Sequence, residues 1–215
     1  MAPSPRTAVP LVITATRQPA ENPYPVYYGG NAEWTSAKLT TYNKVGFKYG
    51  RIEARMKMPQ GIGTWPAFWM LGGDLLEGAS WPECGEIDVM EFRGDISDRS
   101  TGALHGPNTP AGSGLGTAFL SYAPLSDDYH TYAIEWRKNA IDFIVDGSIT
   151  GTYTSADTGA RGWVFNQKFF LILNLAVGGT YAGEDIDPDL NQAEFKIDFD
   201  KFLVSKNSRS LQFTK

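Results

Sequence analysis

The sequence has few of the residues that several classes of site require. It holds one cysteine, Cys84, and two histidines, His105 and His130, among 215 residues. A single cysteine excludes a disulfide within the chain, and so few sulfur and imidazole ligands give no sign of a transition-metal site. We interpret Cys84 as a small buried residue, because no histidine lies near it in the sequence to activate it as a nucleophile.

Long runs of one kind of residue are also missing. The net charge is −5 and no basic cluster occurs, which argues against nucleic acid as a partner. No apolar run approaches the roughly 20 residues of a membrane-spanning helix, so we expect no membrane partner. The first six residues lack the apolar core of a secretory signal.

Strand-like segments recur along the chain, and no long segment has helical periodicity. Hydrophobic residues make up 42% and aromatic residues 13% of the chain, enough to bury the core of one domain over residues 1–215. Residues 1–10 are proline-rich, and we expect them to be disordered. Residues 47–58 alternate as a half-buried antiparallel strand does. We predict further strands at 11–16, 35–40, 64–71, 102–105, 129–135, 140–145, 169–177 and 195–204. This pattern predicts an all-β fold, a β-sandwich.

An acidic segment, residues 81–94, interrupts this apolar pattern. Glu86, Asp88 and Glu91 lie among β-branched and aromatic residues that predict a strand. Side chains alternate between the faces of a regular strand, so Glu91 would point into the core at a large cost in free energy. A β-bulge at Val89–Met90 would put all three acids on one face. It could bring the outer two carboxyl groups to roughly 5–5.5 Å, as in retaining glycosidases.

The alternative interpretation of this segment is a charged strand face in contact with water. Trp65, Trp69 and Trp81 lie just upstream of the acids, and a surface strand does not need them. Indole rings can pack against sugar rings while the N–H donates a hydrogen bond. We therefore interpret the three tryptophans as walls of a sugar-binding cleft, with core packing as their alternative role.

Residues 86–91, Glu-Ile-Asp-Val-Met-Glu, resemble the active-site signature of glycoside hydrolase family 16 in its bulged form. Further blocks resemble the laminarinase (endo-β-1,3-glucanase) branch of that family and follow its order along the chain. These blocks are residues 49–55, 63–72, 81–82, 104–107, 132–136 and 174–179. The resemblance implies a concanavalin-like jelly roll with a concave glycan-binding cleft.

The resemblance implies a role for each of the three acids. Glu86 would be the nucleophile, Glu91 the general acid and base, and Asp88 the residue that positions Glu86. Three carboxyl groups this close cannot all ionise easily, so at least one pKa must rise. We expect Glu91 to hold a proton while Glu86 is charged, which is the division that retention requires. No cofactor is expected for catalysis.

The resemblance also implies which side chains contact the sugar. Arg51 would lie in the cleft, with a salt-bridged polar strand face as its alternative. His105 would contact the sugar or the acids, with a hydrogen-bonded core histidine as its alternative. Asn174, in the middle of an apolar strand, must find a polar partner in the cleft or in the backbone. The predicted substrate-binding set is Arg51, Trp65, Trp69, Trp81, His105 and Asn174.

Asp198 matches the position of an aspartate that binds a structural calcium ion in many members of the family. The other calcium ligands would come from an N-terminal segment, and only ten residues precede the first predicted strand here. We expect that family segment to be absent. An open sheet edge would then offer a route to a dimer, although a monomer is the main expectation. We also expect an extracellular protein whose secretory signal is not in this sequence.

These expectations combine into one functional hypothesis and two alternatives. The hypothesis is a retaining endo-β-1,3-glucanase that hydrolyses internal bonds of laminarin-type β-glucan by double displacement. One alternative is another activity on the same scaffold, hydrolysis of mixed-linkage β-glucan or of agarose. The other is a glycan-binding module of the same fold without turnover.

Overall fold

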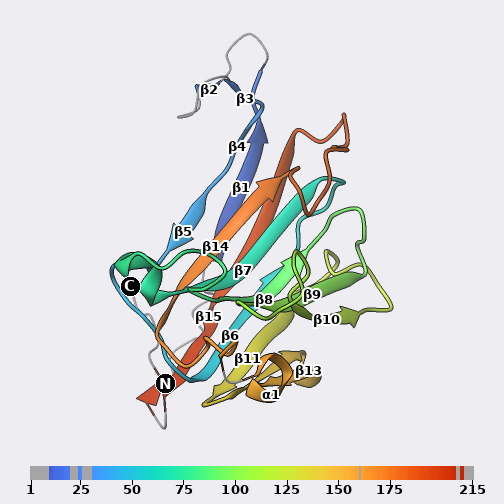
Figure 1. The fold of residues 1–215 in the computed structure, drawn as a ribbon. Helices are drawn as coiled ribbons and strands as arrows, with labels where there is room; N and C mark the ends of the chain where they lie inside the picture. Colours follow the sequence, from blue (N-terminus) through green and yellow to red (C-terminus); the bar gives the residue numbers. More distant parts are fainter. Residues whose placement is uncertain (1–9, 20–23, 26–30, 160, 207–208, 211–215) are drawn as a thin grey trace, which may run out of the picture.

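Two antiparallel β-sheets packed face to face make up most of the protein in the computed structural model (Figure 1). The structure describes residues 10–19, 24–25, 31–159, 161–206 and 209–210. The expectation of disorder at residues 1–10 therefore falls, except for Pro10, outside the described residues.

The larger sheet has eight strands. Its order is β13 (Ser148–Thr154), β12 (Ala140–Val145), β11 (His130–Arg137), β6 (Gly50–Lys57), β15 (Gln192–Lys206), β1 (Leu11–Arg17) and β4 (Trp34–Thr35), with β16 (Arg209–Ser210) paired to β15. The smaller sheet has six strands in the order β10 (Leu115–Leu120), β9 (Arg99–His105), β8 (Glu86–Phe92), β7 (Thr64–Gly72), β14 (Phe169–Val177) and β5 (Lys38–Thr40).

Helical structure is confined to two short segments in the described part of the chain. These are a 3₁₀ turn, η1 (Gly73–Glu77), and one turn of α-helix, α1 (Ser155–Thr158). The strands β2 (Tyr24–Pro25) and β3 (Asn31–Ala32) form a separate pair. No helix in this part of the chain is long and apolar enough to cross a membrane. The predicted all-β jelly-roll sandwich is confirmed.

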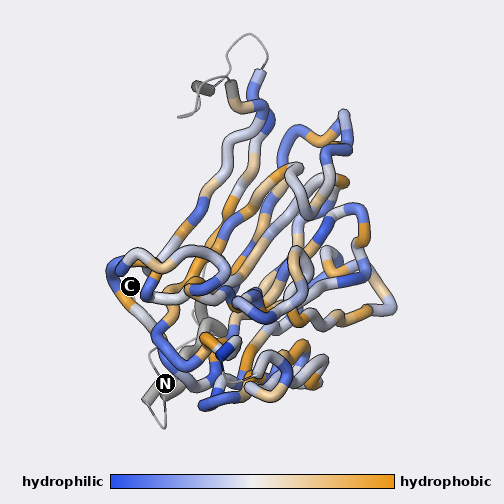
Figure 2. The backbone as a smooth tube through the Cα atoms, in the orientation of Figure 1, coloured by the Kyte–Doolittle hydropathy of each residue, from blue (hydrophilic) through white to orange (hydrophobic). Residues whose placement is uncertain are grey.

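Alternating residues build the core between the two sheets. On β6, Ile52, Ala54 and Met56 are fully buried, whereas the residues between them are partly exposed. Figure 2 shows hydrophobic and hydrophilic positions following one another along many of the strands. The facing strands of the smaller sheet contribute large apolar side chains such as Phe68 on β7 and Phe92 on β8. The inner faces of both sheets are thus used for packing, which leaves the outer face of the smaller sheet free for a site.

The structure differs from the predicted strands in two segments. Residues 35–40 do not form one strand: Thr35 pairs with Thr16 in the larger sheet, whereas Lys38 pairs with Asn174 in the smaller one. The chain crosses from one sheet to the other at this point, and local strand propensity does not reveal such a crossing. Residues 115–120, half of them exposed, form the edge strand β10, which is not among the predicted strands.

Candidate active site

The three acids lie on β8, and a β-bulge sets their direction. Glu91 pairs with Ala67 and Asp88 with Trp69 on β7, so three residues of β8 span the distance of two on β7. The same shift appears on the other side, where Asp88 pairs with Ala103 and Glu91 with Thr101 on β9. The extra residue lies at Val89–Met90, and both side chains are buried in the core. The predicted bulge is therefore confirmed.

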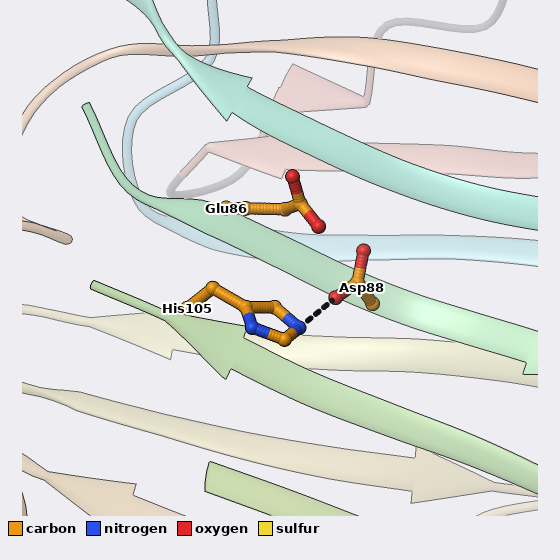
Figure 3. A group of neighbouring side chains, drawn as sticks. All are labelled: Glu86, Asp88 and His105. Atoms are coloured by element: carbon orange, nitrogen blue, oxygen red, sulfur yellow. Dashed lines mark ion pairs between the residues drawn. The ribbon is translucent and has the colours of Figure 1, made fainter. Parts of the chain in front are cut away.

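Glu86, Asp88 and His105 form a compact group. One carboxylate oxygen of each acid and one ring nitrogen of His105 lie within 4.8 Å of one another. Figure 3 shows Glu86 and Asp88 pointing to the same side of β8, and His105 reaching toward them from β9. His105 Nε2 lies 3.1 Å from Asp88 Oδ2. Within the described residues no other group of His, Cys, Asp or Glu side chains could hold a metal ion. Two of its three members, Glu86 and Asp88, are also predicted catalytic acids.

Two tryptophans donate hydrogen bonds to the two outer acids. Nε1 of Trp65 donates to Oε1 of Glu91 at 3.0 Å, and Nε1 of Trp81 donates to Oε2 of Glu86 at 3.1 Å. Trp65 lies on β7, next to β8, whereas Trp81 lies in the loop that leads into β8. Both indoles stand beside the acids as predicted, and each has a defined polar partner there.

Burial raises the pKa of all three carboxyl groups, and the charge of a neighbouring acid raises it further for Glu86 and Asp88. Burial, followed by the charge of Asp88, raises the pKa of Glu86 to about 8. Burial is also the first cause of the raised pKa of Asp88 and of the raised pKa of Glu91. Crowding was expected to raise the pKa of at least one group. Because the pKa of Glu86 itself rises so far, the division with Glu86 ionised and Glu91 protonated is not set by burial alone and stays a prediction.

Two hollows adjoin the acids on the outer face of the smaller sheet. The first hollow has a volume of about 680 Å³ and lies over β9 and β10, where it is lined by Trp81, His105, Thr101 and Tyr181. The second hollow has a volume of about 480 Å³ and lies over β14 and β5. Both hollows are lined by Trp65, Glu86 and Glu91. The acids therefore lie between two halves of one continuous cleft.

Trp69 and Asn174 lie together in the second hollow. Nε1 of Trp69 donates to Oδ1 of Asn174 at 2.7 Å, which gives the polar residue of β14 the partner that it needs. Nζ of Lys38 lies over the Trp69 ring, 5.4 Å from its centroid. One face of this indole is thus covered by a cation, so a sugar has access to Trp69 only where Lys38 leaves it open.

Arg51 is not brought to the cleft. It lies on β6 in the larger sheet and forms ion pairs with Glu53 and Glu135, the latter at 3.5 Å. The predicted contact between Arg51 and sugar is thus corrected to the alternative, a salt-bridged polar face. The alternation along residues 47–58 gave the face of the strand correctly, but it did not tell which of the two sheets the strand joins.

Asp198, the predicted calcium ligand, lies on β15, and its Oδ2 is 3.2 Å from Nη1 of Arg55. No second acidic side chain of the described residues is grouped with it as a metal site. Calcium takes six to eight oxygen ligands, backbone carbonyls among them, so these contacts leave calcium at Asp198 a prediction.

Several residues of the cleft belong to no motif or strand pattern that would identify them from the sequence. Tyr181 is the clearest, because it lies in a loop two residues beyond the last block of the resemblance, Asn174–Gly179. Its hydroxyl is 2.6 Å from Oγ1 of Thr101, and its ring lies 5.2 Å from that of Trp65. The strand period could have placed Thr101 on the same face as His105, had the strand been extended back to Arg99. The cleft residues found only in the structure include Lys38, Arg93, Arg99, Thr101 and Tyr181.

Comparison with known proteins gives a consistent result. The family model of glycosyl hydrolases family 16 matches residues 11–201. The chain is 36% identical over 198 residues to a beta-glucanase of Rhodothermus marinus, covering 88% of this chain and 66% of that protein. It is 38% identical over 161 residues to glucan endo-1,3-beta-glucosidase A1 of Niallia circulans, covering 71% of this chain and only 24% of that one. It therefore spans less than two thirds of the length of these two relatives.

A solved structure shares the fold. The laminarinase catalytic domain of Thermotoga maritima superposes with a TM-score of 0.82 at 36% sequence identity. The match covers 92% of this chain and 78% of that one.

Proposed function

Because the chain belongs to glycosyl hydrolases family 16, we propose that it is a retaining endo-β-1,3-glucanase that hydrolyses internal bonds of laminarin-type glucans by double displacement. The bulge at Val89–Met90 carries this proposal, because it aims Glu86 and Glu91 into one cleft. Two carboxyl groups that flank a scissile bond are what glycoside hydrolysis requires.

Each acid then has one part in the reaction. In the first step Glu86 attacks the anomeric carbon while Glu91 gives its proton to the glycosidic oxygen, and the bond to the leaving sugar breaks. In the second step Glu91 takes a proton from water, the water oxygen attacks the anomeric carbon, and Glu86 is released. Two inversions retain the configuration. Glu86 starts as the carboxylate and Glu91 as the acid.

Two neighbours of Glu86 act on its pKa in opposite directions. Asp88 raises the pKa of Glu86 through its charge, and the nearby imidazole of His105 opposes that effect. A sugar in the cleft brings positive charge at the anomeric carbon in the transition state, which favours the ionised form of the residue that faces it. We therefore propose that the bound sugar, and not the pKa values of the free protein, selects the ionised form of Glu86, and that Asp88 positions Glu86. Hydrolases of this family need no cofactor for catalysis.

The arrangement of the cleft supports endo action and the binding of a polymer. The first hollow extends from the acids over β9 and β10, and the second extends over β14 and β5. A glucan chain can therefore continue on both sides of the bond that is cut. An enzyme that removes single sugars from a chain end would need one side of its site closed.

The experiment is product analysis of the purified chain on laminarin, mixed-linkage β-glucan and agarose, with soluble-glucan affinity measured alongside. We expect short β-1,3 oligosaccharides from laminarin, and proton NMR should show the β-anomer before mutarotation. Glu86→Gln should abolish hydrolysis and keep glucan binding, because it removes the charge and keeps the shape. Turnover by Glu86→Gln would overturn the role of Glu86, and first appearance of the α-anomer would overturn retention.

The alternatives give different outcomes in the same assay. Faster cleavage of mixed-linkage β-glucan or of agarose than of laminarin would favour the alternative, in which the same fold has another substrate specificity. Binding of glucan without any product would mean a binding module.

The site of action and the oligomeric state belong to the same proposal. We propose that the protein acts outside the cell, because a glucan polymer is too large to reach an enzyme behind a membrane. We propose that it acts as a monomer, because the three acids and the two hollows beside them form a cleft without a residue from a second chain. Light scattering tests this, and a dimer through the exposed edge strand β5 would overturn it.

A further inference from the structure

Tyr181 lies where it can affect Glu91 without touching it through a polar atom. It belongs to the loop 178–183, which follows β14 and borders the first hollow. Two backbone bonds hold this loop: Gly178 N–H donates to Gly63 O, and Gly183 N–H donates to Gly179 O, each at 2.8 Å. The loop is thus anchored next to β7, the strand that carries Trp65.

The side chain of Tyr181 makes two contacts that meet at Glu91. Its ring lies 5.2 Å from the ring of Trp65, inclined at 37°, and Trp65 donates its indole N–H to Glu91. Its hydroxyl is 2.6 Å from Oγ1 of Thr101, the residue paired directly with Glu91 across β8 and β9. Tyr181 therefore braces one neighbour of Glu91 on each side.

Other groups hold Tyr181 and Trp65 in this arrangement. The guanidinium of Arg93 lies 5.7 Å from the centroid of the Tyr181 ring, and Asp95 binds Arg93 with two hydrogen bonds. A Cβ atom added to Gly179 would be 3.4 Å from Cζ3 of Trp65, so the backbone of the same loop also lies against the indole. The indole is confined by the loop, and the loop is fixed to the sheet.

We propose that Tyr181 is a positioning residue, which holds Trp65 and through it the carboxyl group of Glu91 in the orientation that proton transfer requires. This inference rests on the proposed function, since it gives Tyr181 a task only if Glu91 is the general acid and base. A misplacement of about 1 Å can cost a hundredfold in rate, so a brace on the donor of Glu91 matters even without contact to the sugar.

The competing role for Tyr181 is a simple platform for a sugar ring in the first hollow. The two roles differ in their dependence on the leaving group. A phenolate leaving group needs a proton from Glu91, whereas 2,4-dinitrophenolate leaves with little help. Loss of a sugar platform would lower kcat/KM equally for a phenyl glycoside and for a 2,4-dinitrophenyl glycoside. Loss of positioning would lower kcat/KM for the phenyl glycoside and leave that for the dinitrophenyl glycoside nearly unchanged.

The test uses aryl β-laminaribiosides with phenol and with 2,4-dinitrophenol as leaving groups, and laminarin as the natural substrate. For Tyr181→Ala we expect kcat/KM to fall about 10- to 100-fold on laminarin and on the phenyl glycoside. On the dinitrophenyl glycoside we expect a change within about twofold. Tyr181→Phe keeps the ring against Trp65 and should retain most of the wild-type ratio between the two aryl glycosides.

The pH profile gives a second readout. The Trp65 N–H bond favours the ionised form of Glu91 and so lowers its pKa relative to burial alone. A loosened indole lets Glu91 keep its proton to higher pH, so the descending limb of kcat/KM should move to higher pH in Tyr181→Ala.

The matched control is Tyr129→Ala: Tyr129 also packs against an arginine, Arg55, at 4.5 Å, but on the larger sheet. Tyr129→Ala should leave the ratio of kcat/KM between the two aryl glycosides and the descending limb of the pH profile unchanged.

Equal loss on both aryl glycosides, with an unchanged descending limb, would overturn the proposal and make Tyr181 a platform. Thermal unfolding of each variant identifies any that does not fold. Tyr181→Leu, which keeps apolar volume but not the flat ring, is then measured in place of Tyr181→Ala with the same expected result. If the wild-type protein hydrolyses neither glucan nor aryl glycoside, the proposed function itself fails, and that result is distinct from an active wild type with unaltered variants.

Discussion

The indole N–H of Trp81 donates to Oε2 of Glu86 at 3.1 Å, although 52% of Trp81 is exposed to solvent. Trp65 does the same for Glu91 from a strand position that is partly buried. Each of the two outer acids thus has its own indole donor, and the donor of Glu86 is the more exposed one. A hydrogen bond to a carboxylate favours its ionised form. The Trp65 bond opposes the rise in the pKa of Glu91 that burial causes, and we expect the Trp81 bond to act on Glu86 in the same direction.

Trp81→Phe should therefore raise the pKa of Glu86, because it keeps a ring and removes the donor. Hydrolysis needs the ionised nucleophile, so the ascending limb of kcat/KM should move to higher pH. Water can take the place of an exposed donor, so we expect a shift below about one pH unit. The measurement is kcat/KM on laminarin between pH 4 and 9.

The matched control is Trp34→Phe. The indole N–H of Trp34 is buried and finds no hydrogen-bond partner among the described residues, and Trp34 lies on β4 in the other sheet. This variant should leave the ascending limb in place. An unshifted limb in Trp81→Phe would contradict a bond that stabilises the nucleophile.

The acidic segment could be predicted from the sequence because everything that determines it is local. The positions of Glu86, Asp88 and Glu91 and the cost of burying a carboxylate together required one extra residue, and the pairing with β7 and β9 confirms it. Arg51 failed for the opposite reason, since its sheet is set by pairing with β11 and β15, distant in the sequence. Tyr181 likewise reaches Thr101 across 80 residues, and no periodicity in a loop encodes such a contact.

Stability should fall as the pH rises, because the folded protein holds protons that the unfolded chain releases. Burial raises the pKa of Glu86 from 4.5 to about 8 and raises the pKa of Asp88 and Glu91 as well. Between these two pH values the folded state binds more protons, so the free energy of unfolding decreases with pH. We expect a loss on the order of a few kcal/mol from pH 5 to pH 8.

Urea unfolding at both pH values measures this loss. Glu86→Gln cannot ionise and should have a smaller decrease between pH 5 and pH 8. Glu77→Gln, at an exposed position in η1, should have the wild-type decrease. A wild-type protein more stable at pH 8 than at pH 5 would refute buried, protonated carboxyl groups.

Arg51→Ala tests the place of Arg51 in the larger sheet. Its guanidinium is bound to Glu53 and Glu135 and lies in neither hollow of the cleft. Partly exposed ion pairs contribute roughly 0–1 kcal/mol, so the free energy of unfolding should change by no more than about that amount. The KM for laminarin should be unchanged. A KM raised about tenfold, with an intact fold, would return Arg51 to the sugar and contradict the structure.

The bulge itself can be tested by deleting single residues from β8. Removal of Val89 leaves the order Glu-Ile-Asp-Met-Glu, in which regular alternation still directs all three acids to the cleft. Removal of Ile87 keeps the bulge and turns Glu86 or Asp88 toward the core, where a carboxylate has no partner. Both deletions remove one buried β-branched side chain, so they are matched in lost apolar burial.

The Val89 deletion should therefore fold, with a loss of about 1.5–3 kcal/mol for the missing side chain, and should keep measurable hydrolysis of laminarin. The Ile87 deletion should fail to fold or lose all activity. Circular dichroism and thermal unfolding compare the two proteins before the assay. If the Ile87 deletion folds and keeps more activity than the Val89 deletion, the direction of the acids is not what the extra residue supplies.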